Sequence, residues 1–597
     1  MTKHFPQANR FGTKHLAQAL LLAQALLPVL LAASLFAMLG GTTQALAQTS
    51  AADPAQIRRQ IELERERKLQ ESTQESTQGL NKNQLLDPSQ GERPGQSIDE
   101  SAFRIHSWLL RGVRLVSETQ LQALLSPYVG RDLGLTQLQA IARLIERHYR
   151  EQGFLARAVI PSQDITQGQI RIEVIEAKLG DIYLEGLRDE ALAKRIRSLL
   201  FAHQPLDEPL RFQALERALA LINELPGVSV IASLSPGFAH QETHLTLKSI
   251  ASDDALHDLE LGIDNFGARA TGRMRKSLLW AWNRPLSWGD QLHLQALHSA
   301  GTRYARLSYS LPLTNEGTRL SAIASALNYE VLQGDFTALS PTGQSQSTGF
   351  ELRQALWRRA QYRIDVTGSV EQKRFEQSVQ GLDTTERRLT SRQLSLESQL
   401  TDQWLKGPQL SAEAIALNTL QLSAVQTDIH TIADSAQTTR LWRWSLSRSQ
   451  PLWSAAAQAV DTRLLLHASG QRSAQNLDSA EKFYVGGSSG VRAFPASEGF
   501  ASNGHMLNAE LRMQFSPSFS VGFMRDRASV WEHEQTRYRY QGYGIQWSWR
   551  ITPQTQMRFV LARRDKANPL PNPITGTDRD GSLERDRMWL SINGVLR

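Results

Sequence analysis

The chain has 597 residues, enough for several domains, and its mean hydropathy of -0.36 excludes a polytopic helical membrane protein. The net charge is +7, but Lys and Arg are scattered singly along the chain rather than gathered in blocks, which argues against a nucleic-acid partner. There is no cysteine, so the sequence offers no disulfide and no thiolate ligand. The spacing of the 14 histidines predicts neither a metal site nor a cofactor.

Residues 1–47 have the pattern of a secretory signal peptide. A basic segment ending at Lys14 precedes a largely apolar run from Leu16 to Leu39, and Ala45-Leu46-Ala47 provides a cleavage site. The apolar run is long enough to span a bilayer, so an uncleaved anchor is the alternative. Both interpretations predict that the remainder of the chain is exported.

Residues 53–70 predict a helix, because Asp53 suits an N-cap and Pro54 suits the first helical turn. Only Ile57, Ile61 and Leu69 form an apolar stripe, so this helix cannot bury a wide face. It is either solvated or lies in a polar cavity. Residues 71–102, rich in Ser, Gln, Gly and Pro, read as a flexible linker. A polar helix on a long tether suggests a detachable element.

Residues 103–249 contain an internal repeat. Gly186 and Gly227 stand at the same spacing as Gly112 and Gly153, with the same order of predicted elements around each pair. Each copy, at 103–176 and 178–249, is predicted to be a β-α-α-β-β unit. An exposed sheet edge in such a unit can accept an extended peptide as an added strand. The alternative is that both edges are blocked and the units are spacers.

Residues 254–597 show alternation of apolar and polar residues instead of helical periodicity. Leu259–Asp264 and Tyr543–Arg550 illustrate the pattern, and twelve of the 13 tryptophans lie in this part, several near segment ends. Aromatic girdles at two membrane interfaces produce such a bias, and the length suits about sixteen tilted strands. The pattern therefore favours an all-β transmembrane barrel with a polar lumen over a soluble β-sandwich.

The stretch at 481–500 interrupts that alternation. Its glycines, Gly486, Gly487 and Gly490, permit a compact loop of unusual backbone shape, and Val491-Arg492-Ala493-Phe494 places a cation between apolar neighbours. The same glycines satisfy the G-x-S-x-G motif of esterases. That motif needs a strand before the serine and a helix after it, and no helical periodicity follows here, which argues against an enzyme.

Tandem β-α-α-β-β units before a barrel, with a late loop carrying V-R-x-F, resemble one family. This family is the two-partner secretion transporters, the haemolysin secretion/activation proteins of the ShlB/FhaC type. Local matches are Ile160-Pro161-Ser162-Gln163, Leu225-Pro226-Gly227-Val228 and Asp264-Asn265-Phe266-Gly267. The resemblance covers Asp53 to Arg597. It implies an N-terminal plug helix, two tandem POTRA domains of α+β fold in the periplasm, and a barrel in the outer membrane of a Gram-negative bacterium.

The resemblance also implies a function. Such proteins carry one large, unfolded, β-helical exoprotein, which is an adhesin, a haemolysin or a contact-dependent toxin, to the cell surface without nucleotide. The POTRA domains would capture the extended substrate, and other partners would be outer-membrane lipid and the barrel assembly machinery. The alternative is a barrel insertase of the same superfamily, although insertases usually have more POTRA units and no plug helix. A third class, an adhesin or passive porin, would not need periplasmic domains.

The family pairs the loop arginine with an aspartate of an F-x-D motif on a later strand. The corresponding stretch is Phe523-Met524-Arg525-Asp526, so the resemblance implies that Arg492 contacts Asp526 on the barrel wall. Met524 stands at the usual aromatic position, Phe523 lies one place early, and Arg525 is another possible partner of Asp526. Two further departures are Ala493, where the family usually has glycine, and a chain ending of Gly594–Arg597 rather than an aromatic residue, an atypical signal for the insertion machinery.

Overall fold

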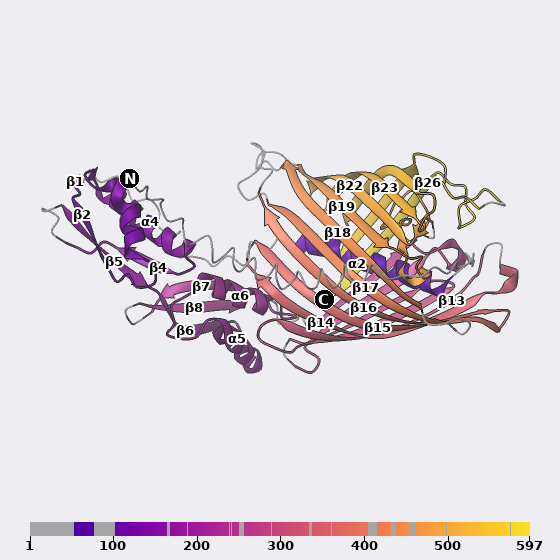
Figure 1. The fold of residues 1–597 in the computed structure, drawn as a ribbon, viewed down its shortest axis with the longest axis horizontal. Coiled ribbons are helices and arrows are strands. Elements are labelled where there is room, and N and C mark those ends of the chain that lie inside the picture. Colours follow the sequence, from indigo (N-terminus) through magenta and orange to yellow (C-terminus); the bar gives the residue numbers. More distant parts are fainter. Residues whose placement is uncertain are drawn as a thin grey trace, which may run out of the picture.

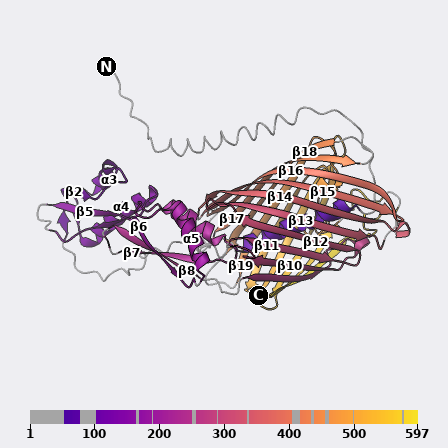
Figure 2. The same ribbon diagram turned by 90° about the horizontal axis from the view of Figure 1, so that it is seen from below.

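Two small α/β domains stand at one end of a closed β-barrel, and a helix lies inside the barrel, as Figures 1 and 2 show from two directions. No helix in the described part of the chain is both long and apolar enough to cross a membrane. The predicted signal peptide at 1–47 and most of the predicted linker at 71–102 lie outside the described residues. The computed structural model describes residues 53–76, 102–163, 168–187, 189–237, 239, 241–249, 256–287, 289–333, 337–359, 361–403, 415–431, 437–453, 460–496, 498–572 and 575–596.

Each of the two repeats folds as a three-stranded sheet with two helices, so the predicted β-α-α-β-β units are confirmed. In both sheets the first and last strands of the unit are parallel, and the remaining strand lies antiparallel at the edge. A short pair, β1 and β3, supplements the first unit. The elements of the first unit are β1 (Phe103–Arg104), β2 (Ser107–Arg111), α3 (Glu118–Leu125), β3 (Asp132–Leu133), α4 (Leu135–Glu151), β4 (Ala156–Val159) and β5 (Gln169–Glu176); those of the second are β6 (Lys178–Glu185), α5 (Glu190–His203), α6 (Phe212–Asn223), β7 (Val230–Pro236) and β8 (Glu242–Ser249).

The helices cover one face of each sheet with the apolar stripes that the sequence predicts. In α4 the predicted face of Leu138, Ile141, Ile145 and Tyr149 is buried against the first sheet. Backbone hydrogen bonds also join the two units: Leu155 N–H donates to Leu210 O over 3.1 Å, and Phe212 N–H donates to Gly153 O over 3.0 Å. The units therefore meet through backbone as well as side chains.

The barrel has sixteen antiparallel strands, in agreement with the predicted number. Alternation along each strand places apolar side chains such as Phe350 and Leu394 outside, while Ser347, Ser391 and Ser423 are buried on the lumen side. Strand β26 pairs with β9 and so closes the cylinder. The strands are β9 (His257–Asp264), β10 (Arg275–Asn283), β11 (Gln291–His298), β12 (Thr302–Pro312), β13 (Thr318–Glu330), β14 (Thr342–Arg358), β15 (Tyr362–Val379), β16 (Leu382–Asp402), β17 (Ala416–Thr431), β18 (Gln437–Trp453), β19 (Asp461–Ser473), β22 (Asn503–Ser516), β23 (Phe519–Trp531), β24 (Tyr538–Arg550), β25 (Thr555–Arg564) and β26 (Asp586–Leu596).

The second α/β unit docks on two turns at the adjacent end of the barrel. The buried Arg358 donates to Glu224 on α6 over 2.5 Å and to Asp365 over 2.5 Å. Arg217 donates to three backbone carbonyls at this rim, two at the end of β14 and one in the turn before β13, among them that of Leu356 over 2.9 Å. Because each guanidinium group donates to acceptors on the opposite body, the unit is fixed to the rim of the barrel.

Helix α2 (Pro54–Ser76) is longer than the predicted helix at 53–70. Its last six residues fall in the segment predicted to be linker. Glu71 and Gln74 continue a helix readily, and the first glycine comes only at Gly79, which explains the extension. The predicted linker therefore begins later than residue 71.

Candidate functional site in the barrel lumen

The loop between β19 and β22 folds into the lumen, where β20 (Phe483–Tyr484) pairs with β21 (Phe500–Ala501). Its glycines are required by the backbone. A Cβ on Gly486 would come within 2.1 Å of Pro495 O, and one on Gly490 within 2.1 Å of Val485 O. Gly487 has φ of +100°. These glycines let the chain turn back tightly enough to present the next four residues to the wall.

Arg492 lies at the inner end of this loop and contacts two carboxylates on the wall. Its Nε and Nη2 donate to Asp526 over 3.0 and 2.8 Å, and its Nη1 donates to Glu510 over 3.2 Å. Its backbone N–H donates to Asp526 as well, over 3.0 Å. Burial alone would lower the pKa of Arg492, but attraction to Asp526 and Glu510 outweighs it, so the pKa lies above its ordinary value and the guanidinium stays charged.

The neighbours of Arg492 in the motif are all buried, Val491 and Ala493 at 0% exposure. The ring of Phe494 meets Tyr540 edge-on at a centroid distance of 5.1 Å. Ala493 lies against Gly542 on β24, where an added Cβ would come within 2.5 Å of the Ala493 Cβ. Ala493 stands where the family usually has glycine, and its methyl group fits because residue 542 on the facing strand is a glycine.

The stretch Phe523–Asp526 shows why the motif is shifted by one residue. Phe523 is 49% exposed on the outer surface, whereas Met524 is buried beside the loop and takes the inward position of the aromatic residue. Arg525 also faces outward and donates to Asp565 over 2.8 Å. The alternative pairing of Arg525 with Asp526 is therefore wrong, because strand alternation puts their side chains on opposite faces.

Sequence reasoning missed two residues of this site. Asn508 on β22 donates to Gly490 O over 2.9 Å and to Asp526 Oδ1 over 2.8 Å. Trp589 on the last strand donates its indole N–H to Arg492 O over 2.7 Å. Asn508 occupies an inward position of β22. An amide side chain at such a position was the only feature of the sequence that could have indicated its contact with the loop. Nothing in the sequence relates Trp589 to the loop.

The start of the loop has a second ionic anchor. Glu481 accepts from Lys373 over 3.0 Å and from Arg443 over 2.8 Å, and only 2% of its side chain is exposed. Burial raises the pKa of Glu481, but the attraction of Lys373, Arg443 and Arg59 dominates and lowers the pKa to about 2. The loop is therefore held by ion pairs at both ends of its inward path.

Helix α2 crosses the lumen beside this loop (Figures 1 and 2). One face has a small apolar contact, in which Ile61 packs with Leu297, Tyr304 and Leu327. The remaining contacts are polar: Arg58 donates to Ser347 Oγ over 2.7 Å and also pairs with Glu371. The interpretation that the predicted helix lies in a polar cavity is thus the correct one of the two left open. Further polar contacts to the wall are those of Asp53 with Arg387, Glu64 with Arg275 and Lys68 with Glu260.

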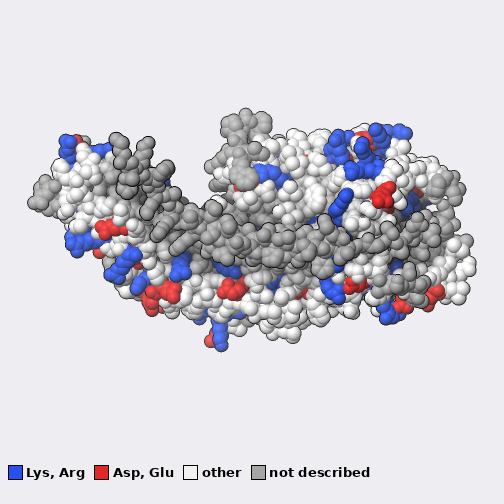
Figure 3. Space-filling model, viewed as in Figure 1, with Lys and Arg blue, Asp and Glu red and all other residues white. Residues whose placement is uncertain are grey.

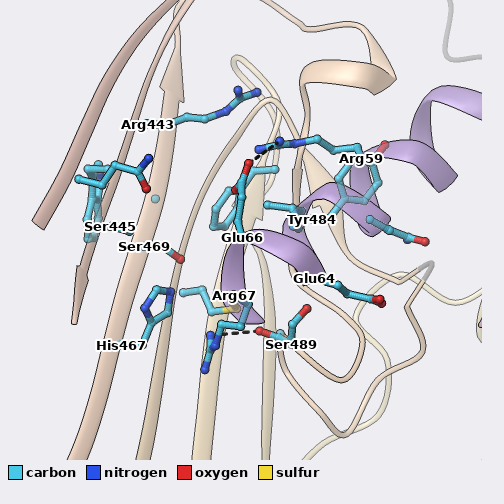
Figure 4. A pocket seen from close by; sticks show the side chains of 18 of the residues that line it. Arg59, Glu64, Glu66, Arg67, Arg443, Ser445, His467, Ser469, Tyr484 and Ser489 are labelled. Atoms are coloured by element: carbon cyan, nitrogen blue, oxygen red, sulfur yellow. Dashed lines mark hydrogen bonds and ion pairs between the residues drawn. The ribbon is translucent and has the colours of Figure 1, made fainter. Parts of the chain in front are cut away.

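Two side chains of α2 reach the loop itself. Gln60 donates to the carbonyl oxygen of Ala496. Arg67 donates to Ser489 O over 3.2 Å and to Asn508 Oδ1 over 3.1 Å. Figure 4 shows Arg67 and Ser489 facing each other, with His467 and Ser469 on the wall nearby. A cavity of about 160 Å³ remains between helix, loop and wall.

Within the described residues, the loop around Ser488 lacks the strand-turn-helix arrangement that the G-x-S-x-G match would require. Turns, not a helix, follow Ser488 within the described loop residues. In the described ranges, no group of three His, Asp or Glu residues is placed to hold a metal ion. The lumen instead combines a helix, an inward loop and a polar wall, which together obstruct a pore.

Comparison with models of known protein families identifies the family of this chain. The model of the haemolysin secretion/activation proteins ShlB/FhaC/HecB matches residues 241–546, just over half of the chain, and that of the ShlB-type POTRA domain matches residues 103–177. The chain belongs to the ShlB/FhaC/HecB family. It is accordingly an outer-membrane transporter whose two POTRA domains lie in the periplasm, and family membership favours secretion over the alternative of a barrel insertase.

Individual relatives agree with this assignment. The heme/hemopexin transporter protein HuxB of Haemophilus influenzae strain 86-028NP is 28% identical over 413 residues, covering 67% of this chain and 70% of HuxB. The outer membrane transporter CdiB of Escherichia coli is 23% identical over 502 residues, covering 78% of this chain and 81% of CdiB.

Solved structures show the same fold. CdiB from Escherichia coli has a TM-score of 0.68 at 19% identity, covering 92% of this chain and 100% of CdiB. CdiB from Acinetobacter baumannii has a TM-score of 0.60 at 17% identity, covering 93% of this chain and 100% of that chain.

The periplasmic location of the POTRA domains fixes the orientation of the barrel. The rim that holds the second POTRA domain is periplasmic, and the loop at 481–500 enters the lumen from the extracellular side.

Proposed function

We propose that this ShlB/FhaC/HecB transporter secretes one large exoprotein of the adhesin, haemolysin or contact-dependent toxin class. The substrate would enter unfolded from the periplasm, pass through the lumen and fold outside, and the folded β-helix could not slide back. No nucleotide, metal or enzymatic step is needed in this scheme. The names of the relatives, a heme/hemopexin transporter protein and an outer membrane transporter, support transport as the function.

The observation that carries the proposal is α2 in the lumen. A plug held by side-chain contacts can be displaced without breaking the backbone hydrogen bonds of any barrel strand. The helix precedes the first POTRA domain in the same chain, so a displaced helix stays attached. A permanently open porin would not need such a helix.

Capture of the substrate is proposed to occur at the free edge of the second POTRA sheet. Strand β7 lies at the edge of the order β6-β8-β7 and is antiparallel to β8. An extended peptide could add there as a fourth strand. Ser233 lies in the middle of β7.

Secretion is tested by co-expressing the transporter with candidate exoprotein genes and measuring the cargo at the cell surface. The expected result is surface cargo with the transporter and periplasmic degradation without it. A photocrosslinker replacing Ser233 should trap cargo, whereas one replacing Thr246 in the middle strand should not. Surface cargo in cells that lack the transporter would refute the function, and equal crosslinking at both positions would refute capture at this edge.

A further inference from the structure

A group of arginines lies on the outer surface of the barrel at its extracellular end. The group consists of Arg472 on β19, Arg527 on β23, Arg539 on β24 and Arg537 in the loop between β23 and β24, and all four are exposed. Strand alternation sets their direction, because the adjacent Asp526, Ala528 and Tyr540 are buried on the lumen side. Figure 3 shows Lys and Arg side chains gathering on this part of the barrel, remote from the POTRA domains.

An indole ring lies in the middle of this arginine group. The guanidinium of Arg537 stacks over Trp531 with its Cζ 4.2 Å from the ring centroid, and the Cζ of Arg472 lies 5.8 Å from the same centroid. His505 meets the ring at 5.7 Å. Two cations are thus held against one aromatic surface, which orients them and leaves their N–H groups available to a ligand.

The carboxylates of the surrounding strands do not neutralise these cations. Strands β22–β24 and the loop at 532–537 contain four acidic residues. Glu510 and Asp526 face the lumen and hold Arg492, while Glu532 pairs with Lys482 over 2.8 Å. Glu534 is 85% exposed beside His533. Among the described residues none of the four arginines forms an ion pair, so like charges gather uncompensated where they would repel one another.

We propose that Arg472, Arg527, Arg537 and Arg539, with Trp531, bind the phosphate groups of lipopolysaccharide in the outer leaflet. Guanidinium groups match phosphate with paired, charge-assisted hydrogen bonds. Below them on the outer surface lie Leu507, Phe523 and Tyr543, each at least 45% exposed, which provide the apolar surface for acyl chains. The arginines therefore lie at the level of the phosphate groups of the lipid, and the apolar side chains lie below them at the level of its acyl chains.

The site has a consequence for the lumen, because β22 and β23 carry Glu510 and Asp526 on their inner faces. A lipid bound across β19, β23 and β24 from outside would brace the strands that anchor the loop from inside. The inference depends on the location in the outer membrane and not on the identity of the cargo.

The test measures binding of bisphosphorylated lipid A to the purified full-length protein, compared with monophosphoryl lipid A and phosphatidylglycerol vesicles. We expect the combined variant R472Q/R527Q/R537Q/R539Q to bind bisphosphorylated lipid A at least 10-fold more weakly. Monophosphoryl lipid A should bind more weakly than the bisphosphorylated form to the unaltered protein. The single variant R537Q, altered only in a loop, should lose binding several-fold and serves where the combined variant does not fold.

The matched control is R374Q/R388Q/R392Q, three outward arginines at the same end of β15 and β16 that already pair with Glu376, Glu386 and Asp428. It should bind within 2-fold of the unaltered protein. Heat-dependent electrophoretic mobility verifies that each barrel is folded. Unchanged binding in both R537Q and the combined variant, or equal affinity for phosphatidylglycerol, would overturn the proposal, and neither outcome bears on whether the protein secretes its cargo.

Discussion

The contact between Arg492 and Asp526 allows a quantitative prediction for the inward loop. The two side chains are 7% and 2% exposed, so removing one charge leaves the other buried without its main partner. Breaking a buried pair in this way costs about 3–5 kcal/mol. The barrel strands are joined to one another by their own backbone hydrogen bonds, so we expect this cost to fall on the docking of residues 486–494, whose opening should become at least ~100-fold more frequent in Asp526→Asn and in Arg492→Gln.

The two substitutions should not add. Once either charge is gone, the second substitution removes a group whose partner is already lost, so the double variant should resemble the singles and the coupling should be about 2 kcal/mol or more. Exchange of the charges, Arg492→Asp with Asp526→Arg, should rescue only in part. Asp526 also accepts from the backbone N–H of Arg492 and from Asn508, and Glu510 would then lie beside a new carboxylate.

Hydrogen–deuterium exchange of residues 486–494 in the purified protein measures the opening, and cargo secretion is the second readout. The control is Arg463→Gln, whose partner Asp461 is 3.4 Å away and whose side chains are 24% and 39% exposed. Such a pair contributes at most about 1 kcal/mol, so exchange of the loop should stay within roughly 5-fold of the unaltered protein. Additive effects of the two buried substitutions, or effects no larger than that of the control, would refute the argument.

Three further predictions concern the other contacts of the lumen and the rim. Ile61→Asp places a carboxylate against the apolar contact of α2 and should raise the open-channel population in planar bilayers by roughly 100-fold, since an unpaired charge there costs about 3 kcal/mol. Arg358→Gln strips Glu224 of its closest partner and should accelerate hydrogen exchange in α6, whereas the exposed Arg388→Gln at the opposite end of the barrel should not. The pKa of Glu481 is lowered on folding, so its contribution is complete above pH of about 4.5 and is lost as pH falls toward 2. Protection of the loop should decline across that window, and in Glu481→Gln it should be weaker at neutral pH and decline less.

The features that the sequence predicts correctly are those with a repeating period. Alternation in Leu259–Asp264 and the helical face of Leu138–Tyr149 reflect burial that recurs along one element, so a window of the sequence contains the signal. The inward side of the shifted motif was not predicted, because Phe523 and Met524 are both apolar and only strand register decides which of them faces the loop. The end of α2 was also missed, since residues 71–76 contain no glycine or proline to stop a helix.

Contacts between distant positions of the chain could not be predicted from the sequence in this way. Ala493 fits because residue 542 is a glycine, and Trp589 meets the carbonyl of Arg492 across almost 100 positions of sequence. Both depend on how deeply the loop enters the barrel, and no local pattern encodes that depth. Family resemblance could supply the partner of Arg492 but not these compensations.

The contacts of plug and loop indicate the order in which the lumen would open. Helix α2 reaches the loop proper through Gln60 and Arg67, which bond backbone carbonyls, and Arg67 also meets Asn508. None of the four hydrogen bonds of Arg492 involves α2. Departure of the helix therefore breaks its own contacts with the wall, among them the pair of the buried Arg58 with Glu371, and leaves the buried ion pair of the loop intact. The helix can therefore leave while the loop stays docked on β22 and β23, because the two elements are anchored to the wall by separate ion pairs.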